Sequence, residues 1–201
     1  GCLGKLHFEI VAERLRREFN IGVINTFPSV LYRVKTKNGE WTEIVKPEDL
    51  PQDYLEIQEP VIALELIAPA KHLSSVLSVQ RKFRMNVIHT ETMGDRILMN
   101  AEMPLVELVS DFDDQMKSAT EGYASFSYEI KGYEPADVLR VDLLVSGEPI
   151  AGRSRFFPRE TLEREARRMV EKLKDLLPRQ QYAQPVQASA GGRIVARADI
   201  K

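Results

Sequence analysis

The fold is set by residues 61–130, whose sequence is VIALELIAPAKHLSSVLSVQRKFRMNVIHTETMGDRILMNAEMPLVELVSDFDDQMKSATEGYASFSYEI. The spacing of apolar residues in this stretch predicts, in order, a strand, a helix, two strands, a helix and a strand. Pro69 and Pro104 open the two helices, and Gly94-Asp95 predicts a tight turn between the paired strands. This order is that of the split βαβ, ferredoxin-like sandwich, in which both helices cover one face of an antiparallel sheet. The six elements are expected over residues 61–68, 70–84, 85–92, 96–103, 105–121 and 123–130.

The flanking segments are expected to be parts of further α+β units. Residues 1–45 combine an amphipathic helix with strands and a type I′ hairpin signal at Asn38-Gly39, so we expect the rear half of a second sandwich there. Residues 46–60 contain three prolines and predict a linker. The central sandwich is expected to occupy residues 61–148, and its complete fold to begin near residue 56. Residues 149–201 predict a truncated α+β C-terminal domain, and we expect the chain, which begins with Gly1, to be a fragment.

Composition narrows the class of protein. The chain has 201 residues, which suit one or two domains, and its one cysteine cannot form an internal disulfide. No apolar run is long enough to span a bilayer. We expect a cytoplasmic protein, and peripheral attachment to the cytoplasmic membrane stays open as an alternative.

Charge is divided unevenly along the chain. The 28 Lys and Arg and 30 Asp and Glu give a net charge of −2. Residues 151–201 contain 12 of the basic and 6 of the acidic residues, a charge of +6, which leaves 16 and 24, or −8, for residues 1–150. Such asymmetry indicates a polyanionic partner for the C-terminal part, against the simpler alternative of a solvated helix face.

Cations with few acidic neighbours form the candidate RNA-binding set. The last helix mixes both signs of charge, so we expect its body to be self-paired at i, i+4. Outside that helix the C-terminal part offers arginines together with amide groups and an aromatic ring that can stack on bases. Three more cations crowd the end of the first central helix, where they also complement the helix dipole. The candidates are Arg153, Arg155, Arg159, Arg179, Gln180, Gln181, Tyr182, Arg193, Arg197, Lys201, Arg81, Lys82 and Arg84.

The sequence predicts neither a catalytic site nor a metal site. His7, His72 and His89 lie on three different predicted elements without other metal ligands at suitable spacing, and we interpret Cys2 as an incidental thiol. No phosphate-binding G-x-x-x-x-G-K-[ST] motif occurs. Carboxylates cluster on the second central helix, where acid–base work is one interpretation and a solvated face the other. They are Glu107, Asp111, Asp113 and Asp114.

Motifs along the whole chain point to one family. They include GCLGKLHFE at residues 1–9, GYASFSYE at 122–129, GEP at 147–149 and LPRQQYAQPVQASAGGRIVAR at 177–197. These stretches resemble G-x-L-G-x-L-H-x-E, G-Y-A-S-F-D-Y-E, N-G-E-P and L-P-R-Q-x-x-x-x-x-I-Q-A-x-x-G-x-K-I-I-A-R of elongation factor 4, the LepA family of ribosome-dependent GTPases.

The resemblance implies a multidomain parent protein. Residues 1–45 would end its domain III, the central sandwich would correspond to domain V of elongation factor G, and residues 149–201 would begin the family's own C-terminal domain. The implied partners are the ribosome, through large-subunit rRNA and the stalk base, and tRNA. The implied role is backward translocation of tRNAs or rescue of stalled elongation, with GTP and Mg²⁺ as cofactors of the parent. The fragment itself would be a monomer without a cofactor, a small-molecule substrate or enzymatic activity.

Two other classes of function remain open from the residues alone. A stand-alone enzyme such as an acyl phosphatase would need an anion cradle with an arginine and a positioned asparagine, whereas the corresponding loops here are Pro69-Ala70-Lys71 and Met93-Gly94-Asp95. A regulatory sandwich would bind a small ligand or a second copy through its open sheet face. Ribosome or RNA binding that weakens steeply with salt would distinguish the translation factor from both.

Overall fold

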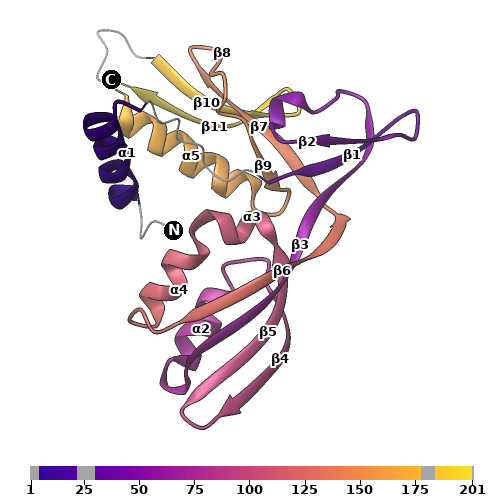
Figure 1. Ribbon diagram of the computed structural model, residues 1–201. Coiled ribbons are helices and arrows are strands. Elements are labelled where there is room, and N and C mark those ends of the chain that lie inside the picture. Colours follow the sequence, from indigo (N-terminus) through magenta and orange to yellow (C-terminus); the bar gives the residue numbers. More distant parts are fainter. Residues whose placement is uncertain (1–4, 22–29, 178–183, 201) are drawn as a thin grey trace.

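The computed structural model describes residues 5–21, 30–177 and 184–200, and these form two antiparallel sheets with helices packed on them (Figure 1). The predicted α+β class is confirmed. The first sheet contains β1 (Tyr32–Thr36), β2 (Trp41–Ile44), β3 (Tyr54–Pro69), β4 (Asn86–Met93), β5 (Arg96–Pro104) and β6 (Ser125–Pro135). The second contains β7 (Val138–Val145), β8 (Glu148–Pro149), β9 (Arg155–Pro158), β10 (Gln184–Ala190) and β11 (Arg193–Ile200). The helical elements are α1 (Lys5–Phe19), η1 (Pro47–Asp49), η2 (Ala70–His72), α2 (Leu73–Gln80), α3 (Leu105–Glu107), η3 (Leu108–Phe112), α4 (Asp113–Ala119) and α5 (Leu162–Leu176).

The central unit has the predicted βαββαβ order. Its strands lie side by side as β6-β3-β5-β4, every neighbouring pair antiparallel, so the first and third strands are central, as in the ferredoxin-like sandwich. The α2 helix and the continuous run α3-η3-α4 cover one face of this sheet (Figure 1). Phe112 is fully buried there, with its ring edge-on to Phe83 at 5.3 Å and to Phe126 at 5.7 Å. Such aromatic pairs add to the stabilisation from burial alone.

Two strands of this unit run further than the sequence predicted. β3 begins at Tyr54, so the expected linker at 46–60 is wrong for its last seven residues, and β6 continues through the expected loop to Pro135. The two extensions pair with each other, from Gln58 opposite Pro135 onward. Pro60 is tolerated because β3 changes partners beside it: β1 pairs up to Gln58, and β5 pairs only from Val61. Proline therefore signalled a break where tertiary pairing keeps the strand intact.

The β1–β2 hairpin belongs to this same sheet. β1 pairs antiparallel with the first part of β3, so the hairpin extends the central sheet and is not part of a separate sandwich. The hairpin is confirmed, but the expected type I′ turn is wrong, since Gly39 has a φ of +85° while Asn38 is not among the positive-φ residues. The amide of Gly39 donates to the carbonyl of Thr36 at 2.9 Å. In α1, the described apolar positions Val11 and Leu15 are half-buried, and Phe19 is exposed.

The second unit is a five-stranded sheet with α5 packed on one face. Its strand order is β11-β10-β7-β8, and β9 pairs with the other end of β7. Because β7 pairs with β10, the sheets divide between residues 135 and 138, whereas the sequence placed the division at 148/149. The predicted stripe of α5 is confirmed, since Leu162, Ala166 and Val170 are buried. They pack on the sheet with Val141, Leu143, Val186 and Ala188.

A separate apolar core joins the two units. Tyr32 and Val34 of β1 pack with Ile57 of β3, Val138 of β7 and Phe156 of β9. The rings of Tyr32 and Phe156 lie 4.7 Å apart between centroids. Hydrogen bonds accompany this junction core: the Ser154 amide donates to Glu48 Oε1 at 3.3 Å, and Arg140 Nη1 donates to the Glu48 carbonyl at 3.4 Å. The junction holds α5 across from the helical run α3-η3-α4 (Figure 1).

Candidate nucleic-acid interface

The predicted candidates separate into three environments. Arg81, Lys82 and Arg84 follow α2 in the first unit. Five candidates, Arg179, Gln180, Gln181, Tyr182 and Lys201, lie outside the described residues. The remaining candidates lie on or beside the strands of the second sheet and are Arg153, Arg155, Arg159, Arg193 and Arg197.

Arg84 is used inside the first unit. Its Nη1 and Nη2 donate to the two carboxylate oxygens of Glu59, the second at 3.0 Å, and its Nε donates to Glu107 at 2.7 Å. Glu59 is only 4% exposed. Burial opposes the charge on Arg84, but the hydrogen bonds and charges of Glu59 and Glu107 raise its pKa above the usual value. Arg84 thereby links the segment after α2 to β3 and α3, and its guanidinium is occupied within the fold.

Tyr32 lies next to this charge cluster and shares its environment. Burial raises the pKa of the Tyr32 phenol, and the negative charge of Glu59 adds to the rise. The ring is therefore neutral at physiological pH and packs as an apolar group against Phe156. Sequence reasoning missed the Glu59–Arg84–Glu107 cluster because its members are far apart in the chain and Glu59 lay in the expected linker.

The two other cations after α2 remain accessible. Arg81 and Lys82 are exposed, and Lys82 Nζ lies 3.5 Å from Gln115 Oε1. A contact between these two residues and RNA stays a prediction.

The candidates on the second sheet differ in how their charges are used. Arg159 pairs with Asp137 at 3.1 Å, and Arg197 pairs with Asp199 at 3.1 Å. Arg153, Arg155 and Arg193 are exposed and form no ion pair with any residue that the structure describes. We refer to these three as the unpaired arginines.

The strand register relates two of the unpaired arginines to each other. Arg193 is opposite Ala190, Ala190 is opposite Val141, and Val141 is opposite Arg155, so these residues form one row across four strands. Residues directly opposite each other project to the same face, which for Val141 and Ala190 is the face that packs on α5. Arg155 and Arg193 therefore end a row on the α5 side, three strand spacings or about 14 Å apart.

The structure adds a set of cations that the sequence analysis had set aside. Arg164, Arg168 and Lys172 recur every four residues on α5, so they share one ridge with about 6 Å of rise between successive members. We refer to them as the α5 basic ridge. Arg164 and Arg168 are each 70% exposed. Lys172 is exposed and forms no ion pair with a described residue.

The expected i, i+4 self-pairing of α5 is wrong in the described structure. Arg164 pairs with its neighbour Glu165 at 3.1 Å, and Lys174 pairs with Glu171 at 3.6 Å. Arg168 pairs outside the helix, with Asp111 of η3 at 3.6 Å. Residues four apart on the Arg164-Arg168-Lys172 ridge are all cations, so no i, i+4 ion pair can form along it. Arg167 does have Glu163 and Glu171 at this spacing, yet it forms no ion pair with a described residue.

The carboxylates of the second central helix are used in different ion pairs. Glu107 pairs with Arg84, Asp111 with Arg168, and Asp113 with Lys117 at 2.9 Å. The side chain of Asp114 is exposed and forms no ion pair with a described residue. This arrangement favours the interpretation of a charged surface over that of a pair of acid–base groups.

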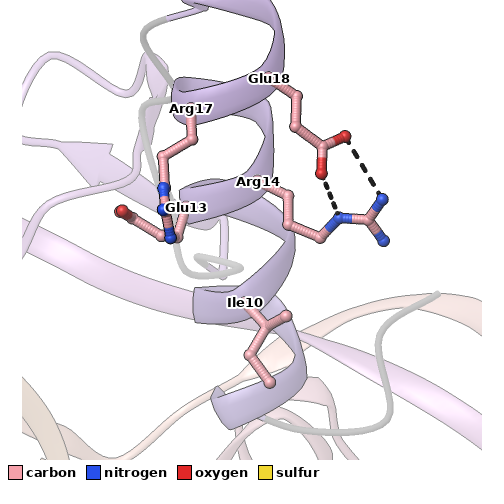
Figure 2. A pocket seen from close by; sticks show the side chains of 5 residues that line it. All are labelled: Ile10, Glu13, Arg14, Arg17 and Glu18. Carbon is pink, nitrogen blue, oxygen red and sulfur yellow. Dashed lines mark hydrogen bonds and ion pairs between the residues drawn. The ribbon is translucent and has the colours of Figure 1, made fainter.

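Two hollows of the described surface are open and lined mostly by charged residues. One of about 720 Å³ is lined by Ile10, Glu13, Arg14, Arg17 and Glu18 of α1, where Arg14 Nε donates to Glu18 at 3.0 Å (Figure 2). This pair raises the pKa of Arg14 and lowers that of Glu18 through their hydrogen bond and opposite charges. Another hollow, of about 550 Å³, lies along α5. Small-molecule sites enclose most of the surface of their ligand, so neither of these open hollows resembles one.

The loops that would form an anion cradle in the central unit contact other parts of the fold. The Ala70 amide donates to the Asp95 carbonyl at 2.7 Å, and Lys71 lies 3.6 Å from Glu121, which uses the groups that an anion cradle would need. His72 Nε2 is buried and lies 3.8 Å from Glu121, whereas His89 is exposed. Cys2 and the side chain of His7 lie outside the described residues. Within the described ranges, no three His, Cys, Asp or Glu side chains are grouped to hold a metal ion.

Comparison with known proteins matches both units. The family model described as "Elongation factor G C-terminus" matches residues 56–142. The family model described as "GTP-binding protein LepA C-terminus" matches residues 145–201. Elongation factor 4 of Thermotoga maritima is 45% identical over 205 residues, and that of Rubrobacter xylanophilus is 44% identical over 202 residues, each match covering 100% of this chain. The chain belongs to the elongation factor 4 family. The resemblance seen in the sequence motifs is thereby confirmed.

The chain spans about a third of the length of the curated relatives it matches, 33% of the first and 34% of the second. A solved structure from Thermus thermophilus has a TM-score of 0.48 and 16% identity, and the match covers 66% of this chain and 34% of that one. That likeness is too low to support a conclusion, and the fold assignment rests on the strand pairing. None of the described helices combines the length and apolar character needed to cross a membrane.

Proposed function

We propose that this chain is the ribosome-binding part of an elongation factor 4 and that its second unit contacts RNA. The observation that carries the proposal is the match to elongation factor 4 relatives along 100% of the chain. The LepA-specific match falls on residues 145–201, the part with excess positive charge. Residues 151–201 contain 12 Lys and Arg against 6 Asp and Glu, and such an excess of cations is what a phosphate backbone binds.

The two units would meet different parts of the ribosome. The unpaired arginines and the α5 side of the second sheet would face tRNA and large-subunit rRNA, where Arg159 and Arg197 could exchange their exposed aspartates for phosphates. Exposed ion pairs contribute little to stability, so such an exchange has a small cost. Arg81 and Lys82 at the end of α2 would contribute a second contact, at the stalk base.

For the parent protein we propose GTP hydrolysis with Mg²⁺ in a G domain outside this chain. The parent would act in the cytoplasm on tRNA positions, through backward translocation or rescue of stalled elongation. The chain described here would position the factor without carrying out chemistry itself, and would do so as a monomer.

The test is cosedimentation of this chain with 70S ribosomes over a range of salt concentrations. We expect binding at low salt that falls steeply as salt rises, because each phosphate contact releases a counterion. Replacing the three unpaired arginines, R153Q/R155Q/R193Q, should reduce the slope of log K against log salt by about three. The control R14Q/R16Q/R17Q removes the same charge from α1 and should leave the slope unchanged.

Absence of ribosome binding at low salt would contradict the proposal. Binding that does not respond to salt would instead favour the regulatory sandwich. The role in translocation is tested with the parent protein, which should move post-translocation complexes backward in a toeprinting assay when GTP is present. Unchanged toeprints would remove that role while leaving ribosome binding intact.

A further inference from the structure

We infer that the α5 basic ridge binds the phosphate backbone of RNA and that Asp111 of the first unit competes with phosphate for Arg168. This inference rests on the proposed function and deepens it, because it adds Arg164, Arg168 and Lys172 to the interface and assigns an internal competitor to it. The ridge lies on the helix that packs on the second sheet, on the same side as Arg155 and Arg193.

The ridge is built as a rigid line of charge. Leu162, Ala166 and Val170 are buried against the sheet, which fixes the rotation of α5 and turns the ridge outward. Three cations follow one another at every fourth residue, with Arg164 and Arg168 each 70% exposed. Guanidinium groups bind phosphate through paired N–H donors, so two arginines and a lysine in line suit a nucleic-acid strand better than a single anion.

Asp111 occupies one position of this line from outside the helix. Its Oδ2 lies 3.6 Å from Arg168 Nη2, and its side chain is 48% exposed. A carboxylate accepts the same N–H donors as a phosphate, and a solvated pair at this distance is weak. RNA can therefore displace Asp111 without exposing a buried charge, and Arg168 is held near its binding position meanwhile.

The structure places Asp111 where it can reach the second unit. Asp111 follows Ser110, whose ψ of −108° departs from helical geometry within η3 and redirects the helix at this residue. Such wide helical turns recur at functional positions. The junction core keeps η3 and α5 across from each other, through the Tyr32–Phe156 stack and the Ser154–Glu48 hydrogen bond. The contact between Asp111 and Arg168 is thus a link between the units at their surface.

The experiment measures the affinity of this chain for fluorescein-labelled poly(U) RNA by fluorescence anisotropy. Asp111→Asn removes the competitor and should tighten binding about two- to fivefold more than Asp114→Asn does. Asp114 is a matched control because it lies three residues away, carries the same charge and has no ion pair with a described residue. Any general effect of removing one negative charge appears in both variants, and only their difference reports on Arg168.

Two further variants test the ridge. In an Arg168→Gln background, the Asp111→Asn and Asp114→Asn changes should become equal. Arg164→Gln with Lys172→Gln should lower the salt slope of RNA binding by about two, while circular dichroism shows unchanged helix content. Equal effects of Asp111→Asn and Asp114→Asn in the wild-type background would overturn the competition. An unchanged slope in the Arg164/Lys172 variant, or no binding of wild type to poly(U) at low salt, would overturn the ridge.

These outcomes are separate from failure of the proposed function. Ribosomes present folded RNA and protein together, so a chain that sediments with ribosomes but ignores poly(U) keeps the proposed function and loses the ridge. A chain that binds neither loses both.

Discussion

Two groups of arginines in this chain have opposite roles, and their surroundings explain the difference. Arg84 lies between Glu59 and Glu107, and its side chain is 31% exposed while that of Glu59 is 5% exposed. Arg164 and Arg168 on α5 are 70% exposed, and each has a single carboxylate partner at 3.1 and 3.6 Å. The first arrangement fixes the guanidinium by burial and several hydrogen bonds, and the second leaves it available to a ligand.

The number of cations in a stretch of sequence therefore does not show how many of them are available to a partner at the surface. Three candidates follow α2, yet one of them neutralises carboxylates from two other elements. The mixed-sign sequence of α5 predicted a self-neutralised helix, yet three of its five cations line up on one ridge. Burial and the identity of spatial neighbours therefore decide whether a cation holds the fold together or binds a partner.

The junction between the units should respond most strongly to mutation. Phe156 is 9% exposed and stacks on Tyr32 at 4.7 Å. Phe156→Ala should lower the free energy of unfolding by about 3 to 5 kcal/mol, because it removes a buried ring and leaves a cavity. Urea denaturation measures the change. Phe19→Ala on α1, where the ring is 65% exposed, is the control and should change stability little. A similar loss in both variants would show that burial of Phe156 between the two units does not stabilise the fold.

Mutation of the buried Glu59–Arg84–Glu107 cluster should cause the second largest loss of stability. Arg84→Met leaves the carboxylate of Glu59, 4% exposed, without its partner, and should cost about 3 kcal/mol of unfolding free energy. Arg168→Met on α5 removes the same charge from the surface and should cost less than about 0.5 kcal/mol. Chemical denaturation of both variants measures the difference. If the two losses are equal, the contrast between the arginine groups has no energetic basis.

The sequence predicted the parts of the fold that repeat a local pattern. Alternation and helical spacing located β7 and the buried stripe of α5, and the βαββαβ order followed from those patterns in the central unit. The pairing of β1 with β3 and the path of β3 through Pro60 could not be predicted this way, since both depend on which strand lies alongside. Local signals gave the elements, and long-range pairing decided how far two of them extend.

The candidate site was predictable to a smaller extent. An excess of positive charge after residue 150 pointed to the second unit, and that signal needs only counting. The distinction between Arg84 and Arg155, or between Arg168 and Lys174, needs distances across elements. A four-residue spacing of cations on α5 was visible in the sequence, but the equally visible glutamates at the same spacing from Arg167 favoured self-pairing. Only the distances show that α5 forms other ion pairs instead.

Mutation of the α5 basic ridge should weaken RNA binding without lowering the free energy of unfolding. Arg164→Gln with Lys172→Gln should weaken RNA binding about tenfold, since two charge-assisted contacts of modest strength are lost. The same variant should unfold within about 0.5 kcal/mol of wild type, because both residues are exposed. Anisotropy titration and urea denaturation on one preparation give both values. If the free energy of unfolding falls as much as the free energy of binding, the ridge holds the fold together, as Arg84 does, and is not a binding surface.

We expect the smallest loss of stability from removing the Glu48–Ser154 hydrogen bond across the junction, and we expect this loss to depend on pH. Glu48 accepts a hydrogen bond from the Ser154 amide at 3.3 Å. Burial raises the pKa of Glu48, but hydrogen bonds from the backbone amides of Glu48 and Ser154 and the charge of Arg140 outweigh it, so the net pKa lies below its usual value. A carboxyl group whose pKa is lowered on folding stabilises the folded state above its unfolded pKa, about 4.3, and loses that contribution as pH falls through the folded pKa.

Glu48→Ala should therefore lower the free energy of unfolding by about 0.5 kcal/mol at pH 7, because solvent screens this carboxylate, and its difference from wild type should shrink as pH falls below about 4. Asp49→Ala, in the same η1 turn but exposed, is the control and should leave the pH profile of wild type unchanged. Thermal unfolding followed by circular dichroism over a pH series measures both. A Glu48→Ala difference that stays constant with pH would mean that the contact acts by packing alone, and the junction would then be held by its apolar core without help from charge.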